Sequence, residues 1–148
     1  MPVTEEQIRA LERYRLNATL VRQTFHAYWN AHPHPEREGR GDPAEPEFFA
    51  WMSMWYSTVW VVWEGCISLG LELNLRPELQ EQYRRLLFDF RNKTFHAQRA
   101  FPPPAMMRYI EQEHSVSWVY ALTSEITIAI HAEARALGMT PNDDGFYL

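Results

Sequence analysis

A permanent cation, an amide and an imidazole lie close together in the stretch FRNKTFHAQ, residues 90–98. Histidine has an ordinary pKa of about 6.5, so His96 can accept or donate a proton near neutral pH. Arg91 offers a charge that does not titrate and a fork of donors that fits a pair of anionic oxygens. Asn92 could orient His96 or bind an oxygen of the same anion. These residue types predict proton transfer at an anionic group, with Arg91, Asn92 and His96 as catalytic candidates.

The spacing of the arginine and the histidine raises a geometric question. Their separation of five residues corresponds to about 140° of rotation on a regular α-helix, so the two side chains point in different directions. Arg91 and His96 can share a ligand within one chain only if the helix is distorted between them. The alternative is that a second copy of the motif faces the first. Asn92, His96 and Arg99, by contrast, fall on one helical face.

Positive charge is concentrated around this motif although the whole chain is acidic. The 148-residue chain has a net charge of −5. Between positions 76 and 99, six basic residues stand against three acidic ones: Arg76, Arg84, Arg85, Arg91, Lys93 and Arg99 against Glu78, Glu81 and Asp89. The overall charge argues against bulk, sequence-blind binding of nucleic acid, and the local charge leaves room for a basic cleft. Lys93 and Arg99 are therefore candidate supporting residues.

The pattern of apolar residues predicts an all-α fold in one domain spanning residues 1–148, a bundle of four or five helices. Thr4 and Gln7 have capping-box spacing, which indicates a helix that begins near Glu5. Its apolar stripe consists of Ile8, Leu11, Tyr14, Ala18, Val21, Phe25 and Tyr28. Residues 30–46 contain four prolines and two glycines, which is typical of a loop.

The remaining elements follow from helix signals. An aromatic helix runs to about Gly70, and Pro77 suits the first position of a third helix that leads into the motif. The prolines at 102–104 end that helix. A helical stretch from about Ala105 to Leu137 follows, with a break near positions 114–115 and Gly138 as its cap. We expect the tail, residues 139–148, to be loose.

Composition excludes several classes of protein. The single cysteine, Cys66, rules out an intramolecular disulfide and fits a reducing compartment. The first residues are polar and charged, so no signal peptide is visible and we expect a cytoplasmic protein. The apolar run 48–71 is long enough to span a bilayer, but Glu64 and several small polar residues interrupt it. A core helix is the better interpretation. The six Trp, seven Tyr and eight Phe indicate that some aromatic surface is buried against a partner.

The string from Arg91 to His96 resembles the R-x(4–6)-H signature of the HEPN superfamily, in which a polar residue, often Asn, follows the arginine. Members are small helical bundles, and many are ribonucleases that need no metal in toxin–antitoxin, abortive-infection and CRISPR-associated systems. The resemblance implies a homodimer in which two motifs meet across a two-fold axis in one cleft. It also implies RNA as a partner, a possible antitoxin or regulatory protein as another, and no cofactor or metal.

The chemistry that the resemblance implies is cleavage of RNA by its own 2′-hydroxyl. His96 would take the proton of that hydroxyl or protonate the leaving oxygen, and Arg91 would bind the charge that develops on the phosphorane. Glu64 is a supporting candidate because a carboxylate on an apolar helix needs a partner, and Arg91 or His96 could be that partner. A solvent-facing polar strip of Ser53, Ser57, Glu64 and Ser68 is an equal alternative.

Three other interpretations stay open. The charges of Arg91 and Lys93 could simply be solvated, with His96 at the surface. The chain could be a catalytically silent HEPN-like module that binds RNA, a nucleotide or a protein. Finally, Glu111 and His114 form one E-x-x-H pair, the spacing of a metal site in a helical bundle, although no second pair is present.

Overall fold

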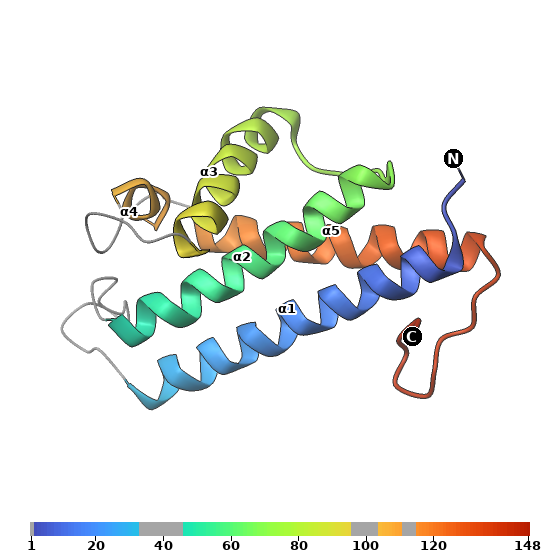
Figure 1. Cartoon of the computed structure of the whole chain (residues 1–148), viewed down its shortest axis with the longest axis horizontal. Coiled ribbons are helices and arrows are strands. Elements are labelled where there is room, and N and C mark those ends of the chain that lie inside the picture. The colour runs from blue at the N-terminus through green and yellow to red at the C-terminus, as the bar shows by residue number, and fades with distance from the viewer. Residues whose placement is uncertain (1, 33–45, 96–103, 111–114) are drawn as a thin grey trace.

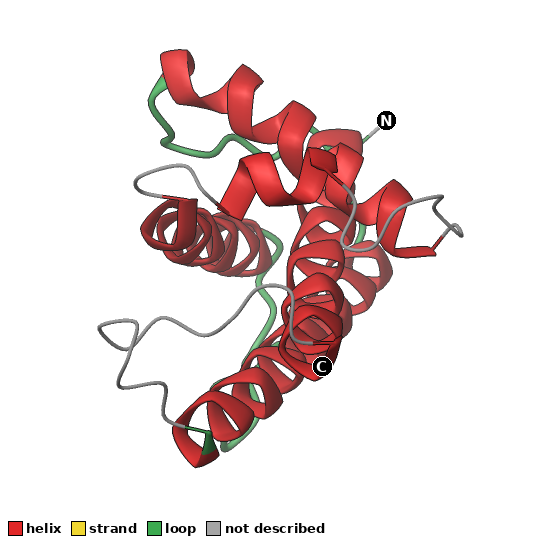
Figure 2. Cartoon of the chain, turned by 90° about the vertical axis from the view of Figure 1, so that its left-hand side faces the viewer, coloured by secondary structure: helices red, strands yellow, loops and turns green. Residues whose placement is uncertain are grey.

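The computed structural model describes residues 2–32, 46–95, 104–110 and 115–148, and it is all-helical, as predicted. Its five helices are α1 (Glu5–Ala31), α2 (Pro46–Ser68), α3 (Pro77–Phe95), α4 (Pro104–Ile110) and α5 (Ser115–Ala136). No strand occurs within these described ranges, and Figure 2 draws only helices, loops and turns there. The five-helix form of the predicted bundle is therefore the one observed.

The aromatic helix α2 is the centre of the bundle. It packs against α1, α3 and α5, while α4 lies against α3 and α5. In Figure 1, α1, α2 and α5 run side by side along the long axis, and α3 crosses them steeply. The side chains of α2 are apolar almost all round, which is typical of a helix covered by neighbours on several sides. Every other long helix is positioned by its contact with α2 or with α1.

Most aromatic side chains of α2 are buried within the chain itself, and Trp51 is half-buried. Phe48, Phe49, Trp55, Tyr56, Trp60 and Trp63 each expose 6% of their surface or less. These six rings are covered by neighbouring helices of the same chain, and contact of other aromatic surface with a partner stays a prediction. Across the described helices, none combines the length and apolar character that crossing a bilayer requires. The interpretation of 48–71 as a core helix agrees with both observations.

Several helix ends lie where their capping residues predict. Thr4 and Gln7 form the complete capping box: the Gln7 N–H donates to Thr4 Oγ1 at 3.3 Å, and the Thr4 N–H donates to Gln7 Oε1 at 3.0 Å. Pro77 is the first residue of α3. Gly138 follows α5 with a φ of 75°, and the Met139 N–H donates back to Ala134 O at 3.0 Å. This left-handed position suits glycine, as predicted for a C-terminal cap.

The C-terminal tail differs from our expectation that it is loose. Met139 and Tyr147 are buried, and Phe146 is half-buried. The physical reason is a turn: the Asn142 side-chain oxygen accepts from the Asp144 and Phe146 N–H groups at 3.2 and 2.8 Å. The turn directs the two aromatic rings back toward the bundle. The tail therefore belongs to the packed domain.

The polar strip expected along α2 is divided into a buried half and an exposed half. Ser53 and Ser57 are buried, whereas Glu64 and Ser68 are exposed. Within the described part of the chain, neither buried hydroxyl has a hydrogen-bond partner. Such a group loses its hydration without compensation, which costs about 1–3 kcal/mol. The two serines therefore reduce stability where they stand.

This finding predicts that Ser57→Ala stabilises the protein. The substitution removes an unpaired buried hydroxyl and improves helix propensity, so we expect a gain of about 0.5–2 kcal/mol in the free energy of unfolding. Denaturant unfolding followed by circular dichroism measures it. Ser68→Ala is the matched control, since the exposed Ser68 hydroxyl donates to Glu64 O at 2.8 Å, and its effect should stay within about 0.5 kcal/mol. A clear loss of stability in Ser57→Ala would contradict the prediction.

Candidate functional site

The arginine of the motif lies near the end of α3 and is hydrogen-bonded to its neighbour. Arg91 Nη1 donates to Asn92 Oδ1 at 2.8 Å, and both side chains are half-buried. Lys93, also half-buried, is the basic residue of the last turn of α3. The side-chain bond holds one edge of the guanidinium and orients Asn92. His96 and Arg99, the other two predicted site residues of this region, lie outside the described residues.

An aromatic cluster in the core anchors the helical turn of α3 that contains Arg91. Phe90 is fully buried, and its ring centroid lies 6.3 Å from that of Phe49, 5.2 Å from that of Tyr56 and 5.8 Å from that of Tyr109. The first two rings belong to α2 and the third to α4. Because Phe90 precedes Arg91, this packing sets the position of the Arg91 backbone. The site is thus built on a rigid part of the fold.

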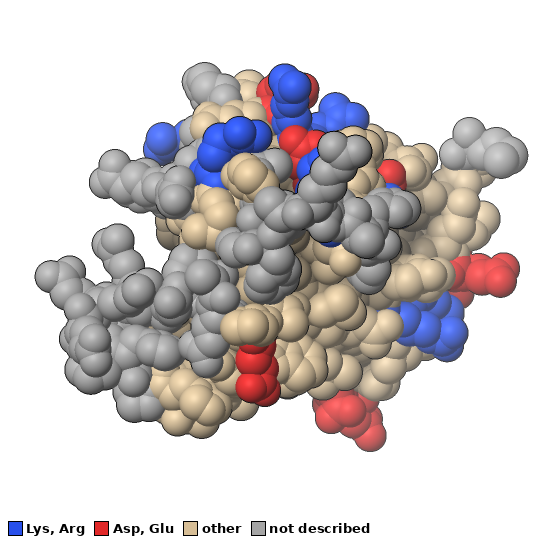
Figure 3. All heavy atoms as spheres, turned by 60° about the vertical axis from the view of Figure 1, so that its left-hand side comes forward, with Lys and Arg blue, Asp and Glu red and all other residues tan. Residues whose placement is uncertain are grey.

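The surface around α3 is rich in positive charge. Figure 3 shows Lys and Arg side chains gathered at the top of the molecule, where Figure 1 places α3, with a few acidic groups among them. Arg84 and Arg85 are exposed, while Arg91 and Lys93 are half-buried. The local basic character that the sequence predicts is therefore displayed on one side of the fold.

Glu64 is not paired with the arginine of the motif. Its side chain is exposed and makes no ion pair within the described residues. Phe90 packs on Tyr56, and Glu64 lies about 12 Å farther along α2, at 1.5 Å per residue. The structure therefore brings Arg91 and Asn92 together and leaves Glu64 in solvent. Of the two interpretations of Glu64, the exposed position fits the solvent-facing one.

The metal-site alternative rests on residues that the structure does not describe, since Glu111 and His114 both lie outside the described ranges. Among the residues that are described, no group of three or more His, Cys, Asp and Glu side chains is placed to hold a metal ion. Cys66 is fully buried, and burial raises the pKa of its thiol to about 12. It therefore remains protonated and packs as a small apolar side chain.

Comparison with protein-family models, curated proteins and solved structures found no match for this chain. The resemblance to the HEPN superfamily therefore rests on the residues from Arg91 to His96 and on the helical fold.

A second polar cluster, which the sequence did not predict, joins α1 to α5. Arg15 donates to both oxygens of Glu12, from Nε at 2.6 Å and from Nη2 at 2.8 Å, and His131 Nε2 lies 3.2 Å from Glu12 Oε1. Glu12 is fully buried and Arg15 is 8% exposed. Burial acts to raise the pKa of Glu12, but the hydrogen bonds and charges of Arg15 and His131 outweigh it and lower that pKa.

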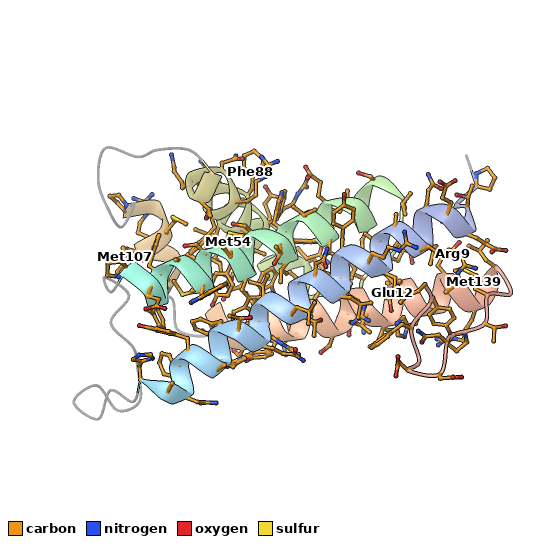
Figure 4. All side chains as sticks on the ribbon, turned by 60° about the horizontal axis from the view of Figure 1, so that its bottom comes forward. Arg9, Glu12, Met54, Phe88, Met107 and Met139 are labelled. Atoms are coloured by element: carbon orange, nitrogen blue, oxygen red, sulfur yellow. The ribbon has the colours of Figure 1, made fainter. Side chains whose placement is uncertain are left out.

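The tail covers this cluster. The Arg15 guanidinium carbon lies 5.8 Å from the centroid of the Phe146 ring, and the His131 ring meets the Tyr147 ring edge-on at 5.0 Å. Figure 4 places Glu12 and Met139 toward the same end of the molecule as Arg9, away from Phe88 on α3. The charges of this cluster are balanced within the chain. We therefore assign it to stability rather than to ligand binding.

One feature of the sequence does indicate the buried Glu12–Arg15 pair. Glu12 and Arg15 have the i, i+3 spacing of a helical ion pair and lie on the same face as Ile8 and Leu11. Tyr14 was expected on that buried face, but it is 55% exposed. Glu12 and Arg15 therefore lie on the buried face of α1, where the sequence predicted Tyr14.

A third polar contact lies between α1 and α5, where the Tyr120 hydroxyl is hydrogen-bonded to His26 Nε2. The Arg22 guanidinium carbon lies 5.7 Å from the centroid of the Tyr120 ring. Burial lowers the pKa of His26, and the charge of Arg22 lowers it further. Both effects favour the neutral imidazole, which is hydrogen-bonded to Tyr120.

The buried pair predicts a large effect of Glu12→Gln. The substitution keeps the shape but leaves Arg15 buried without a counter-charge, which should cost about 3–5 kcal/mol of unfolding free energy. The double variant Glu12→Leu/Arg15→Met removes both charges and should lose much less. Denaturant unfolding at neutral pH measures both. Equal losses in the single and double variants would contradict the assignment.

The lowered pKa of Glu12 also predicts how this contribution depends on pH. A carboxyl whose pKa is lower in the folded state stabilises above its unfolded pKa of about 4.3, and the stabilisation is lost as pH falls toward the folded value. Wild type should therefore lose more stability than the double variant between about pH 5 and pH 3. Parallel acid unfolding curves for the two proteins would overturn this expectation.

Proposed function

We propose that the protein is a metal-independent endoribonuclease of HEPN type, in which Arg91 and His96 of two copies form one cleft across a homodimer. The observation that supports this most is the Arg91–Asn92 pair, held near the end of a packed helix, with His96 four residues after Asn92 in the sequence. A fixed cation beside a titratable imidazole is what cleavage of a phosphodiester by an adjacent hydroxyl requires.

In the proposed reaction, His96 takes the proton of a ribose 2′-hydroxyl, whose oxygen then attacks the neighbouring phosphorus. The bond from phosphorus to the 5′-oxygen breaks, and that oxygen receives a proton from a second acid, the His96 of the other copy or water. Arg91 binds the non-bridging oxygens while negative charge develops on them. The products are a 2′,3′-cyclic phosphate and a 5′-hydroxyl.

A homodimer resolves the geometric question of the motif. Within a regular helix, Arg91 and His96 point about 140° apart, and two facing copies would need each side chain only to reach a shared cleft. The buried aromatic residues of α2 give no support to a dimer, because the chain covers them itself. The support comes from the motif geometry and from the resemblance.

A second candidate function is RNA binding without catalysis. The exposed basic residues Arg84 and Arg85 favour it, since binding of phosphates requires such charges but does not require His96. In that case the chain would be a silent HEPN-like module.

The cleavage proposal predicts that His96→Ala lowers the rate of RNA cleavage by about 10²- to 10⁴-fold, because general acid–base catalysis is lost. Arg91→Ala should lower it by a comparable factor, about 10²- to 10³-fold, because charge on the transition state is no longer bound. The assay is cleavage of single-stranded RNA in the presence of a chelator, with identification of the cyclic phosphate on the product.

Circular dichroism and light scattering serve as controls for this assay. Both variants should keep the wild-type helix content, and light scattering should find a dimer at micromolar concentration. Equal cleavage by wild type and both variants would show that the activity lies elsewhere or comes from a contaminant. Binding of RNA by a wild-type protein that cleaves none would favour the second candidate function.

A further inference from the structure

One face of α3 presents an aromatic ring between two arginines. Phe88 is 44% exposed, although it is a large apolar side chain in the middle of a helix. Arg84 precedes it by four residues and Arg91 follows it by three, so all three lie on one face. At 1.5 Å per residue, the two arginines are separated by about 10 Å along the helix axis. The ring therefore lies between two fixed positive charges.

The ring of Phe88 is held in place from beneath. Its centroid lies 5.5 Å from that of Trp60 in an edge-to-face contact, and Trp60 in turn meets Trp63 edge-to-face at 5.6 Å. Trp60 and Trp63 are both buried in the core. Both tryptophans belong to α2, so one side of the Phe88 ring faces that helix, and Figure 4 labels Phe88 on α3. The contact fixes one side of the ring and leaves the rest available to a planar ligand.

Among the described residues, the acidic groups near this face do not cancel its charge. Glu81 approaches Arg84 at 4.0 Å, but both side chains are largely exposed, at 83% and 52%. An exposed pair at this distance contributes little and is easily exchanged for a phosphate. Asp89 lies on the other side of the helix from the line between Arg84 and Arg91, and Arg85 adds an exposed positive charge one residue along.

We propose that this face of α3, defined by Arg84, Phe88 and Arg91, binds single-stranded RNA by stacking a base on Phe88 and by holding flanking phosphates on the two arginines. Proteins that bind single strands combine positive charge along the backbone with aromatic rings under the bases. The exposed charges of Arg84 and Arg85 favour a polyanion as the ligand of this face. This inference rests on the proposed function. The α3 face would guide the RNA substrate toward Arg91.

The test measures binding rather than cleavage, in a His96→Ala background with a labelled single-stranded oligoribonucleotide of mixed sequence. Phe88→Ala and Phe88→Leu should weaken binding roughly 5- to 150-fold, the range for loss of one stacked base. Phe88→Trp should keep or improve affinity. Leucine preserves apolar contact with Trp60, so a loss in this variant isolates the aromatic face from packing. Tyr14→Ala is the control, an exposed aromatic on α1, and it should leave affinity unchanged.

The salt dependence of RNA affinity distinguishes the contribution of the arginines from that of the Phe88 ring. Arg84→Ala should reduce the slope of log K against log salt by about 0.7, the value for one phosphate contact with a single strand. Phe88→Leu should lower affinity with the slope unchanged. Arg135→Ala removes an exposed charge from the end of α5 and should leave both quantities as they are.

The outcomes also distinguish this inference from the proposed function. Unchanged affinity in Phe88→Leu, in a protein that binds RNA, overturns the stacking site while the Arg91–His96 reaction stands. Loss of affinity in Phe88→Leu, with no cleavage by wild type, supports the binding face and removes the catalytic proposal. Conversion of a dimer to a monomer by Phe88→Leu, with RNA affinity per protomer unchanged, assigns the face to contact between copies and overturns the inference.

Discussion

The burial of the aromatic side chains of α2 is the constraint on which the rest of the structure depends. α2 has almost no polar face, so it requires α1, α3 and α5 to cover it. Each of these helices can then turn its other side to solvent or to a partner. The packing of Phe90 against Phe49 and Tyr56 is the part of this arrangement that positions the motif. A rigid core thus supports a helix whose outer face is free to carry charge.

Charged side chains occur in two different environments in this fold. Near the start of α1, the carboxylate of Glu12 is enclosed by Arg15, His131 and the aromatic tail, and its charge is balanced inside the chain. Along α3, Arg84 has a weak partner in Glu81, and among the described residues the exposed Arg85 makes no ion pair. A charge that the fold leaves without a firm partner remains available to an anionic ligand. This contrast is the electrostatic reason for locating the proposed RNA path on α3.

Local signals in the sequence predicted the helices and the place of the motif. Pro77 at the start of α3 and Gly138 after α5 act through backbone restraints that do not depend on the rest of the fold. The same signals predicted that Arg91 lies on the third helix, but they placed the end of that helix at the prolines 102–104. The bond between Arg91 and Asn92 did not follow from them, because neighbouring side chains on a helix usually diverge.

Features that depend on distant contacts were not predicted. The burial of Glu12 requires His131, which is 119 residues away, and a tail turned back by Asn142. The exposure of Glu64 depends on which side of α2 the other helices leave uncovered, and no local pattern of residues reveals this. The burial of most α2 aromatic rings likewise depends on other helices. In each case the outcome is set by tertiary packing rather than by spacing along one helix.

Complementation between two inactive variants tests the central claim, a cleft shared between copies, most directly. Arg91→Ala and His96→Ala chains with different affinity tags would be produced together, and the mixed dimer isolated through both tags. A shared cleft in that dimer retains one arginine from one copy and one histidine from the other, so RNA cleavage should partly return while each single variant stays inactive. A mixed dimer as inactive as its parents, alongside an active wild type, would place Arg91 and His96 in a site within one chain and contradict the account.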